Sequence, residues 1–147
     1  MKLSTRSTYG MRAMLELALA AGQGPVMVRE IAERQHLPAT YLEQLMVLLR
    51  KAGLVSATRG AHGGYALARE ARDITIAEII EVLEGPLDLV ECPSGAGCCG
   101  QPEVCALCDL WDDAGKTLTA FFQGMTLAAL AERQRAKSAA PVLMYSI

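Results

Sequence analysis

Apolar residues recur at helical spacing along the first third of the chain and predict three short helices, over residues 6–21, 28–35 and 40–51. Gly22 and Gly24 follow the first helix, and Gly53 follows the third, where glycine commonly ends a helix. Pro38 cannot lie inside a helix, so we expect residues 36–39 to form a tight connection. The predicted buried faces are Met11, Met14, Leu15 and Ala18, then Val28, Ile31 and Ala32, then Leu42, Leu45, Met46 and Leu49.

The third helix is expected to begin at Thr40, because Thr40 and Glu43 have the spacing of a capping box. Two helices joined by a turn of about four residues, with polar residues on the second, have the layout of a helix-turn-helix. The same pattern also fits any pair of antiparallel helices with a solvated outer face. The residues that follow favour the helix-turn-helix.

Residues 54–58 and 65–68 read as two short strands around a glycine-rich tip, Arg59-Gly60-Ala61-His62-Gly63-Gly64. Such a hairpin after a helix-turn-helix predicts a winged helix-turn-helix. Glycines allow the tip to approach a phosphate backbone, and an arginine suits the negative potential of a narrow minor groove. Arg59 is therefore the expected wing contact.

The second half of the chain predicts a helix over 76–83, an irregular loop over about 92–103, and a long helix from 104 or 105 to 123. The apolar stripe of the long helix is larger than so small a chain easily covers, so we expect it to pair with the same helix of a second copy. The alternative is that it packs only on its own chain. A last short helix is expected over 126–134, with a loose tail after Lys137.

The predicted fold is thus mainly α. It comprises a winged helix-turn-helix DNA-binding domain (1–85), a Cys-rich cluster-binding loop (86–104), a dimerisation helix with a short terminal helix (105–137) and a tail (138–147).

The formal net charge of −2 conceals two opposed halves. Residues 1–72 carry 10 Lys and Arg against 5 Asp and Glu, whereas the remainder carries 4 against 11. A basic half suits a nucleic-acid partner. No stretch approaches the ~18 apolar residues that would span a membrane, and charged residues interrupt the apolar N-terminal stretch, so we expect a cytoplasmic protein.

All five cysteines, Cys92, Cys98, Cys99, Cys105 and Cys108, fall within 17 residues. In a reducing compartment such clustering indicates metal or redox chemistry rather than a disulfide scaffold. Thiolates bind iron–sulfur clusters and zinc, and the spacing favours a cluster because structural zinc sites prefer two close pairs. A switch that forms and breaks disulfides is also open. No nucleophile stands near a base in the pattern, so we expect no enzyme.

The chain resembles the Rrf2 family of bacterial winged-helix regulators, and most closely its iron–sulfur cluster regulator, IscR-like, branch. The resemblance covers roughly residues 1–135. Its marks are Met1-Lys2-Leu3 with Tyr9-Gly10, Tyr41-Leu42-Glu43-Gln44-Leu45, Leu48-Leu49-Arg50-Lys51-Ala52-Gly53-Leu54-Val55, Arg59-Gly60 with Gly63-Gly64-Tyr65, and the cysteine segment leading into Leu110-Trp111. The resemblance implies a homodimer that binds operator DNA and whose cluster state tunes promoter binding.

The IscR-like branch holds a 2Fe–2S cluster with three cysteines and a histidine. Cys92 and Cys105 match the first and third cysteines, while Cys108 occupies the histidine position, which implies an all-thiolate site. Cys98 keeps the family spacing from Cys92 and Cys99 keeps the spacing to Cys105; we favour Cys99, with Cys98 as the alternative. Relatives that sense nitric oxide or iron carry a 4Fe–4S cluster, so both cluster types stay open.

The expected DNA contacts lie at the start of the third helix and at the wing. Glu43 has two alternative roles, to select promoters by accepting from cytosine or repelling phosphate, or only to complete the helix cap. An electron-transfer protein is the rival class, and it would show no salt-dependent operator binding. The candidate DNA-binding residues are Tyr9, Thr40, Tyr41, Glu43, Gln44, Arg50 and Arg59.

Overall fold

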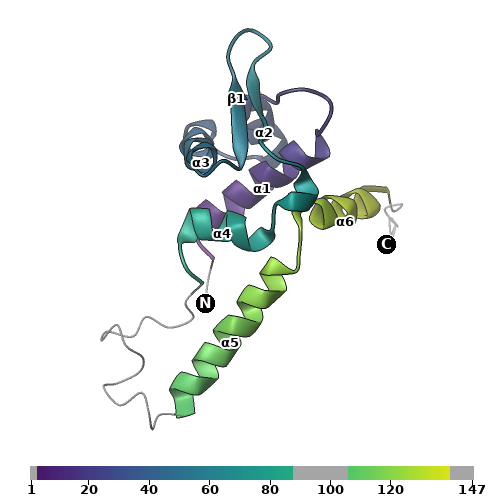
Figure 1. The fold of residues 1–147 in the computed structure, drawn as a ribbon. Coiled ribbons are helices and arrows are strands. Elements are labelled where there is room, and N and C mark those ends of the chain that lie inside the picture. Colours follow the sequence, from purple (N-terminus) through teal and green to yellow (C-terminus); the bar gives the residue numbers. More distant parts are fainter. Residues whose placement is uncertain (1–2, 88–105, 140–147) are drawn as a thin grey trace, which may run out of the picture.

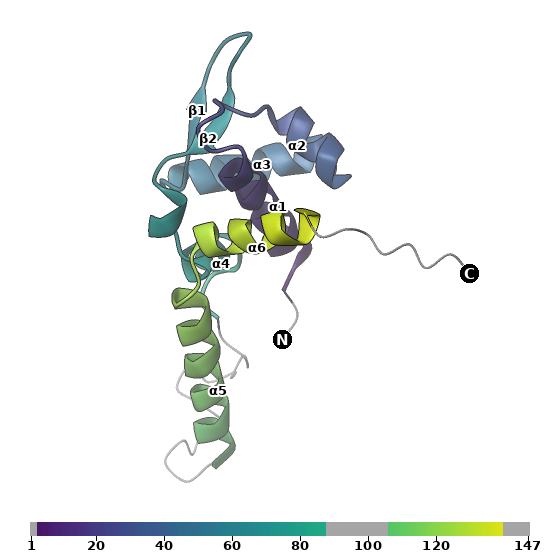
Figure 2. The same ribbon diagram turned by 90° about the vertical axis from the view of Figure 1, so that its right-hand side faces the viewer.

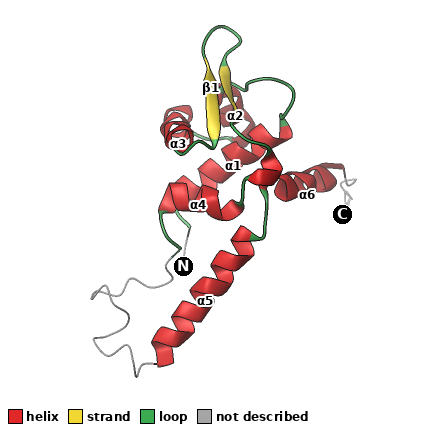
Figure 3. Cartoon of the chain, in the orientation of Figure 1, coloured by secondary structure: helices red, strands yellow, loops and turns green. Residues whose placement is uncertain are grey.

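The computed structural model describes residues 3–87 and 106–139. Helices dominate this part of the chain and a single hairpin provides its strands (Figures 1 and 3). The elements are α1 (Thr5–Leu19), α2 (Val28–Gln35), α3 (Ala39–Lys51), β1 (Val55–Thr58), β2 (Gly64–Leu67), the 3-10 turn η1 (Ala71–Asp73), α4 (Ile76–Glu84), α5 (Ala106–Gln123) and α6 (Leu127–Ala139).

The hydrophobic core lies between α1, α3 and α4, with α2 and α6 completing it. The predicted faces of α2 and α3 are confirmed as buried, and α4 buries the face of Ile76, Ile79, Ile80 and Leu83. Burial of these apolar side chains supplies most of the free energy that holds the helices together.

The predicted face of α1 is only partly right, because Met11 and Leu15 are half-buried. The buried face instead contains Gly10, Ala13, Met14, Leu17 and Ala18. The physical reason is the approach of α4: a Cβ atom added at Gly10 would overlap the Leu83 side chain. Glycine at this position therefore lets α1 and α4 come close.

The predicted capping box at the start of α3 is wrong. Pro38 is the N-cap, α3 begins at Ala39, and no side chain caps it. Thr40 thus occupies the second helical position, where it is exposed on the first turn rather than capping it. At the other end Gly53, with φ of 74°, follows the C-cap as predicted. The turn before α3 places His36 in the left-handed region, at φ of 53°.

The wing is an antiparallel pair in which Val55 faces Leu67 and Thr58 faces Gly64. At its base Val26 and Tyr65 exchange two backbone hydrogen bonds of 2.8 Å each, which attach the hairpin to the α1–α2 connection. Added Cβ atoms at Gly63 and Gly64 would overlap the backbones of Thr58 and Val26 respectively. Both glycines are therefore required by the close packing of the wing on itself and on its base.

Helix α5 extends away from the winged unit, and α6 returns to pack against α1 and η1 (Figures 1 and 2). The chain between them, at Thr126, pairs with Thr75 in an antiparallel bridge. The hydroxyl of Thr126 accepts from the backbone N–H of Ala129 at 3.2 Å and so caps α6. Helix α6 continues to Ala139, so it is longer than the predicted helix over 126–134 and includes the first two residues of the predicted tail. Residues 140–147 lie outside the described residues.

Candidate DNA-reading surface and cysteine site

The exposed N-terminal end of α3 carries the predicted base-reading residues. Thr40, Glu43 and Gln44 are exposed, while Tyr41 is half-buried. Arg50, in the last turn, is also exposed. The buried residues Leu42, Leu45, Met46 and Leu49 fix the rotation of the helix about its axis, so its opposite, polar face points to solvent.

Tyr9 on α1 packs against Tyr41 on α3. The two rings meet edge to face, with centroids 6.0 Å apart and an interplanar angle of 77°. This geometry is favourable for aromatic pairs. Tyr9 therefore lies next to the start of α3 and supports it, a contact that hydrophobic spacing alone did not forecast.

Arg59 directly follows β1 at the exposed wing tip, and none of the described carboxylates forms an ion pair with it. Strand β1 packs against α3, and the hairpin projects beyond the helices of the winged unit (Figure 1). His62 is exposed at the same tip. The wing thus presents the exposed guanidinium of Arg59, which pairs with no carboxylate among the described residues.

The sequence that contains the cysteines follows α4, whose last residues are bonded to the start of α1. Glu84, the last residue of α4, accepts a hydrogen bond of 2.7 Å from the backbone N–H of Ser4. Hydrogen bonds from Ser4 hold the pKa of the Glu84 carboxyl below its usual value. Arg6 adds a bond of 3.3 Å to the carbonyl of Leu83. These contacts anchor the end of α4 to the start of α1.

Cys108 is the one predicted ligand that the described residues include. It lies half-buried in the first turn of α5 and is disulfide-bonded. Cys92, Cys98, Cys99 and Cys105 lie outside the described residues. Within residues 3–87 and 106–139, no group of three or more Cys, His, Asp or Glu is placed to hold a metal ion.

Thiol donors fit an iron–sulfur cluster, which cysteine thiolates normally hold. Cys108 is disulfide-bonded, so its disulfide must be reduced before its sulfur can bind iron.

Helix α5 leaves an apolar face exposed. Leu107, Leu110, Trp111 and Phe121 are 59%, 54%, 43% and 57% exposed, and no residue of α5 is buried. Lys116 and Asp112 form an ion pair elsewhere on the helix, and that carboxylate raises the pKa of Lys116. The described part of this chain therefore does not cover the apolar face. A contiguous exposed apolar patch of this kind typically marks an interaction surface.

A helix-turn-helix followed by a two-stranded wing defines a winged-helix transcription regulator. The family model for Rrf2, described as an iron-dependent transcriptional regulator, matches residues 3–133. The HTH-type transcriptional regulator IscR of Klebsiella pneumoniae (strain 342) is 40% identical over 134 residues, which cover 91% of this chain and 82% of that protein. The chain therefore belongs to the Rrf2 family of transcriptional regulators, which bind DNA.

Solved structures agree with this assignment. CymR, described as the global cysteine regulator of B. subtilis, matches with a TM-score of 0.80 and 40% identity, over 90% of this chain and 98% of CymR. IscR of T. potens matches with a TM-score of 0.79 and 40% identity, over 99% of this chain and 97% of that protein. CymR and the Klebsiella IscR are both described as regulators. In the described part of this chain, no helix is suited to crossing a bilayer.

Proposed function

We propose that this chain is a cytoplasmic homodimeric transcription regulator whose operator binding depends on an iron–sulfur cluster. Cys92, Cys99, Cys105 and Cys108 would hold the cluster, with 2Fe–2S favoured over 4Fe–4S. The observation that carries the proposal is the position of Cys108 on α5, the helix that also bears the uncovered apolar face. The cluster and the dimer contact would then both involve α5.

The proposed DNA contacts follow from exposure and position. Thr40, Tyr41, Glu43 and Gln44 lie on the first turns of α3, where side chains reach base edges in the major groove. Tyr9 supports Tyr41, and the exposed Arg50 and Arg59 supply positive charge to the DNA backbone and to the minor groove. Together these residues form one reading surface per protomer, and a dimer would present two at a fixed spacing.

An iron–sulfur cluster, when bound, supplies redox and iron-dependent chemistry to the site. The chain contributes four thiolates and the helix end that carries one of them. Loss of the cluster would alter how the cysteine segment and α5 are held. The dimer would then favour a different spacing between its two α3 helices. The proposed target genes are those of cluster biogenesis or of an iron or redox stress response.

A thiol–disulfide regulator is the second candidate. Two observations favour it: the disulfide at Cys108 and the similarity to CymR, whose description names it a cysteine regulator. In that case oxidation and reduction of the thiols, without iron, would change operator binding.

Anaerobic purification of the full chain distinguishes these functions. We expect a coloured protein with about two iron and two sulfide per chain, as a 2Fe–2S centre requires. About four of each would replace the 2Fe–2S assignment with 4Fe–4S. A colourless protein with about one zinc per chain would overturn the cluster in favour of a zinc-stabilised regulator. A metal-free protein whose operator affinity follows its thiol oxidation state would establish the second candidate.

Replacing Arg59 with alanine should weaken operator binding about tenfold, because one cationic contact is lost. The slope of the logarithm of the binding constant against the logarithm of salt concentration should become shallower by about one unit. Fluorescence anisotropy over a series of salt concentrations measures both quantities. Arg133→Ala is the matched control, since it removes the same charge from the exposed surface of α6. Equal effects in the two variants would mean that the wing makes no specific contact.

A further inference from the structure

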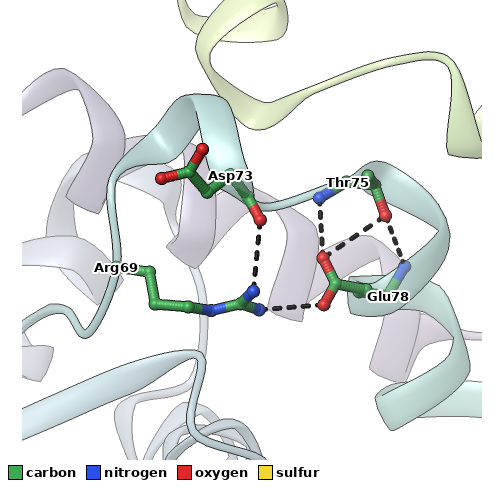
Figure 4. Close-up of polar contacts among 4 residues, drawn as sticks. All are labelled: Arg69, Asp73, Thr75 and Glu78. Atoms are coloured by element: carbon green, nitrogen blue, oxygen red, sulfur yellow. Dashed lines mark hydrogen bonds and ion pairs between the residues drawn. The ribbon is translucent and has the colours of Figure 1, made fainter.

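A cluster of polar contacts joins the segment after the wing to the start of α4 (Figure 4). The guanidinium of Arg69 donates to the carbonyl of Asp73 at 3.2 Å and to Glu78 Oε1 at 2.9 Å. The second carboxylate oxygen, Oε2, accepts from the backbone N–H of Thr75 at 2.9 Å, and the Thr75 hydroxyl accepts from the N–H of Glu78 at 3.2 Å. One carboxylate thus closes the capping box of α4 and binds an arginine at the same time.

On one side this cluster meets the wing. Strand β2 ends at Leu67, and the next residue, Ala68, donates a backbone hydrogen bond of 3.0 Å to Leu54, just before β1. Arg69 follows directly. The two ends of the wing are therefore tied together immediately before the residue that binds Glu78.

On the other side the cluster meets the connection between α5 and α6. Thr75 pairs with Thr126, and the flanking bonds run from Ile76 N–H to Met125 at 2.9 Å and from Leu127 N–H to Ile74 at 2.8 Å. The side chains of Ile74 and Leu127 are fully buried. The end of α5 is thereby fixed to the same short segment that Arg69 and Glu78 hold.

We propose that Arg69 and Glu78 are positioning residues that fix the orientation of the wing relative to α5. The segment 68–78 is a connector: its N-terminal end holds the wing, its middle pairs with the α5–α6 connection, and the Arg69–Glu78 contact closes it. A displacement of α5 would be transmitted to the wing through this segment. The proposal depends on DNA binding by the family and not on the cluster, so its failure would leave the proposed cluster function standing.

An ordinary surface ion pair is the alternative, since Arg69 and Glu78 are 42% and 40% exposed. The neighbouring pair of Arg72 with Glu70 is of that kind, at 4.0 Å with both side chains at least 71% exposed. Arg69 differs because its guanidinium also binds a backbone carbonyl, and its partner also caps a helix. A charge-assisted network that joins two segments constrains geometry more than an isolated surface pair does.

The experiment measures binding of the full chain to a DNA duplex selected from a random library by the unaltered protein. We expect Arg69→Ala and Glu78→Gln each to weaken binding about fivefold, with the salt slope unchanged. Glu78→Gln is decisive, because removing a negative charge should strengthen DNA binding if electrostatics alone operated. Arg72→Ala is the matched control and should leave affinity within about twofold, as expected for an exposed pair.

Amide hydrogen exchange provides the second readout. We expect both variants to exchange faster in β1 and β2 while the thermal midpoint of the whole chain moves little, and the double variant to lose no more affinity than either single one. A shallower salt slope for Arg69→Ala together with unweakened binding by Glu78→Gln would overturn the proposal, since Arg69 would then be a direct phosphate contact. Unchanged wing exchange in both variants would overturn it as well.

Discussion

Replacing Leu110 with glutamate should convert the protein from dimer to monomer and weaken operator binding by at least about 100-fold. Leu110 is 54% exposed in the single chain and lies within the apolar face of α5 that we propose as the dimer contact. A carboxylate placed in such a contact would be buried without a partner, which costs several kcal/mol, of order 3–5. A monomer presents only one reading surface, so the second half-site is lost. Sedimentation velocity and fluorescence anisotropy measure the two effects.

Ala120→Glu is the control for this variant, because it adds the same charge to an exposed position of α5 outside the apolar face. We expect it to remain dimeric with operator affinity near that of the unaltered protein. A Leu110→Glu protein that remains a dimer would show that the two copies meet elsewhere. Dissociation of both variants to the same extent would show that added charge, rather than loss of the apolar contact, is responsible.

Replacing Cys108 with serine should abolish cluster binding, because a serine hydroxyl in the first turn of α5 does not replace a thiolate ligand. Replacing it with histidine should preserve a cluster but raise its reduction potential, by about 100 mV or more, since imidazole ligands raise the potential relative to thiolates. Iron and sulfide analysis under anaerobic conditions and a redox titration measure these outcomes. Retention of the full iron content by Cys108→Ser would remove Cys108 from the ligand set.

The two adjacent cysteines provide a matched pair for the same measurement. Cys99→Ser should lose iron, whereas Cys98→Ser should retain it, because Cys99 keeps the family spacing to Cys105. The reverse result would exchange their roles and leave the rest of the ligand set unchanged.

Periodicity predicted the helices well where burial is one-sided. The faces of α2 and α3 are those expected, because each of these helices packs one apolar stripe against the core. The predicted face of helix α1 was right at Met14 and Ala18 but missed Gly10, because glycine has no hydrophobic signal although it allows close contact with Leu83 of α4. Hydrophobic periodicity is read from side-chain polarity, so it does not detect a contact that depends on the absence of a side chain.

Local motifs were ambiguous without their three-dimensional surroundings. The Thr40–Glu43 pattern suggested a capping box, but Pro38 already has the backbone angles of an N-cap and starts the helix one residue earlier. The same pattern at Thr75 and Glu78 does form a capping box. Sequence spacing alone does not distinguish these two cases.

For the candidate site too, features set by the local sequence were predictable, whereas contacts between distant segments were not. Exposure of Gln44 and Arg59 follows from local pattern, and the structure agrees. The Tyr9–Tyr41 contact and the pairing of Thr75 with Thr126 join segments far apart in the sequence, so single-sequence reasoning had no signal for them. The ligand assignments at four of the five cysteines lie outside the described residues and stay predictions.

The bond between Ser4 and Glu84 brings together the two ends of the unit that reads DNA. This bond holds the end of α4 in place at residue 84, while α6 packs against α1 and completes the core. Evolution could therefore exchange the segment between α4 and α5, for one that holds a different ligand or none, without rebuilding the helices that present the reading surface. A common DNA-reading module would then serve regulators that respond to different signals.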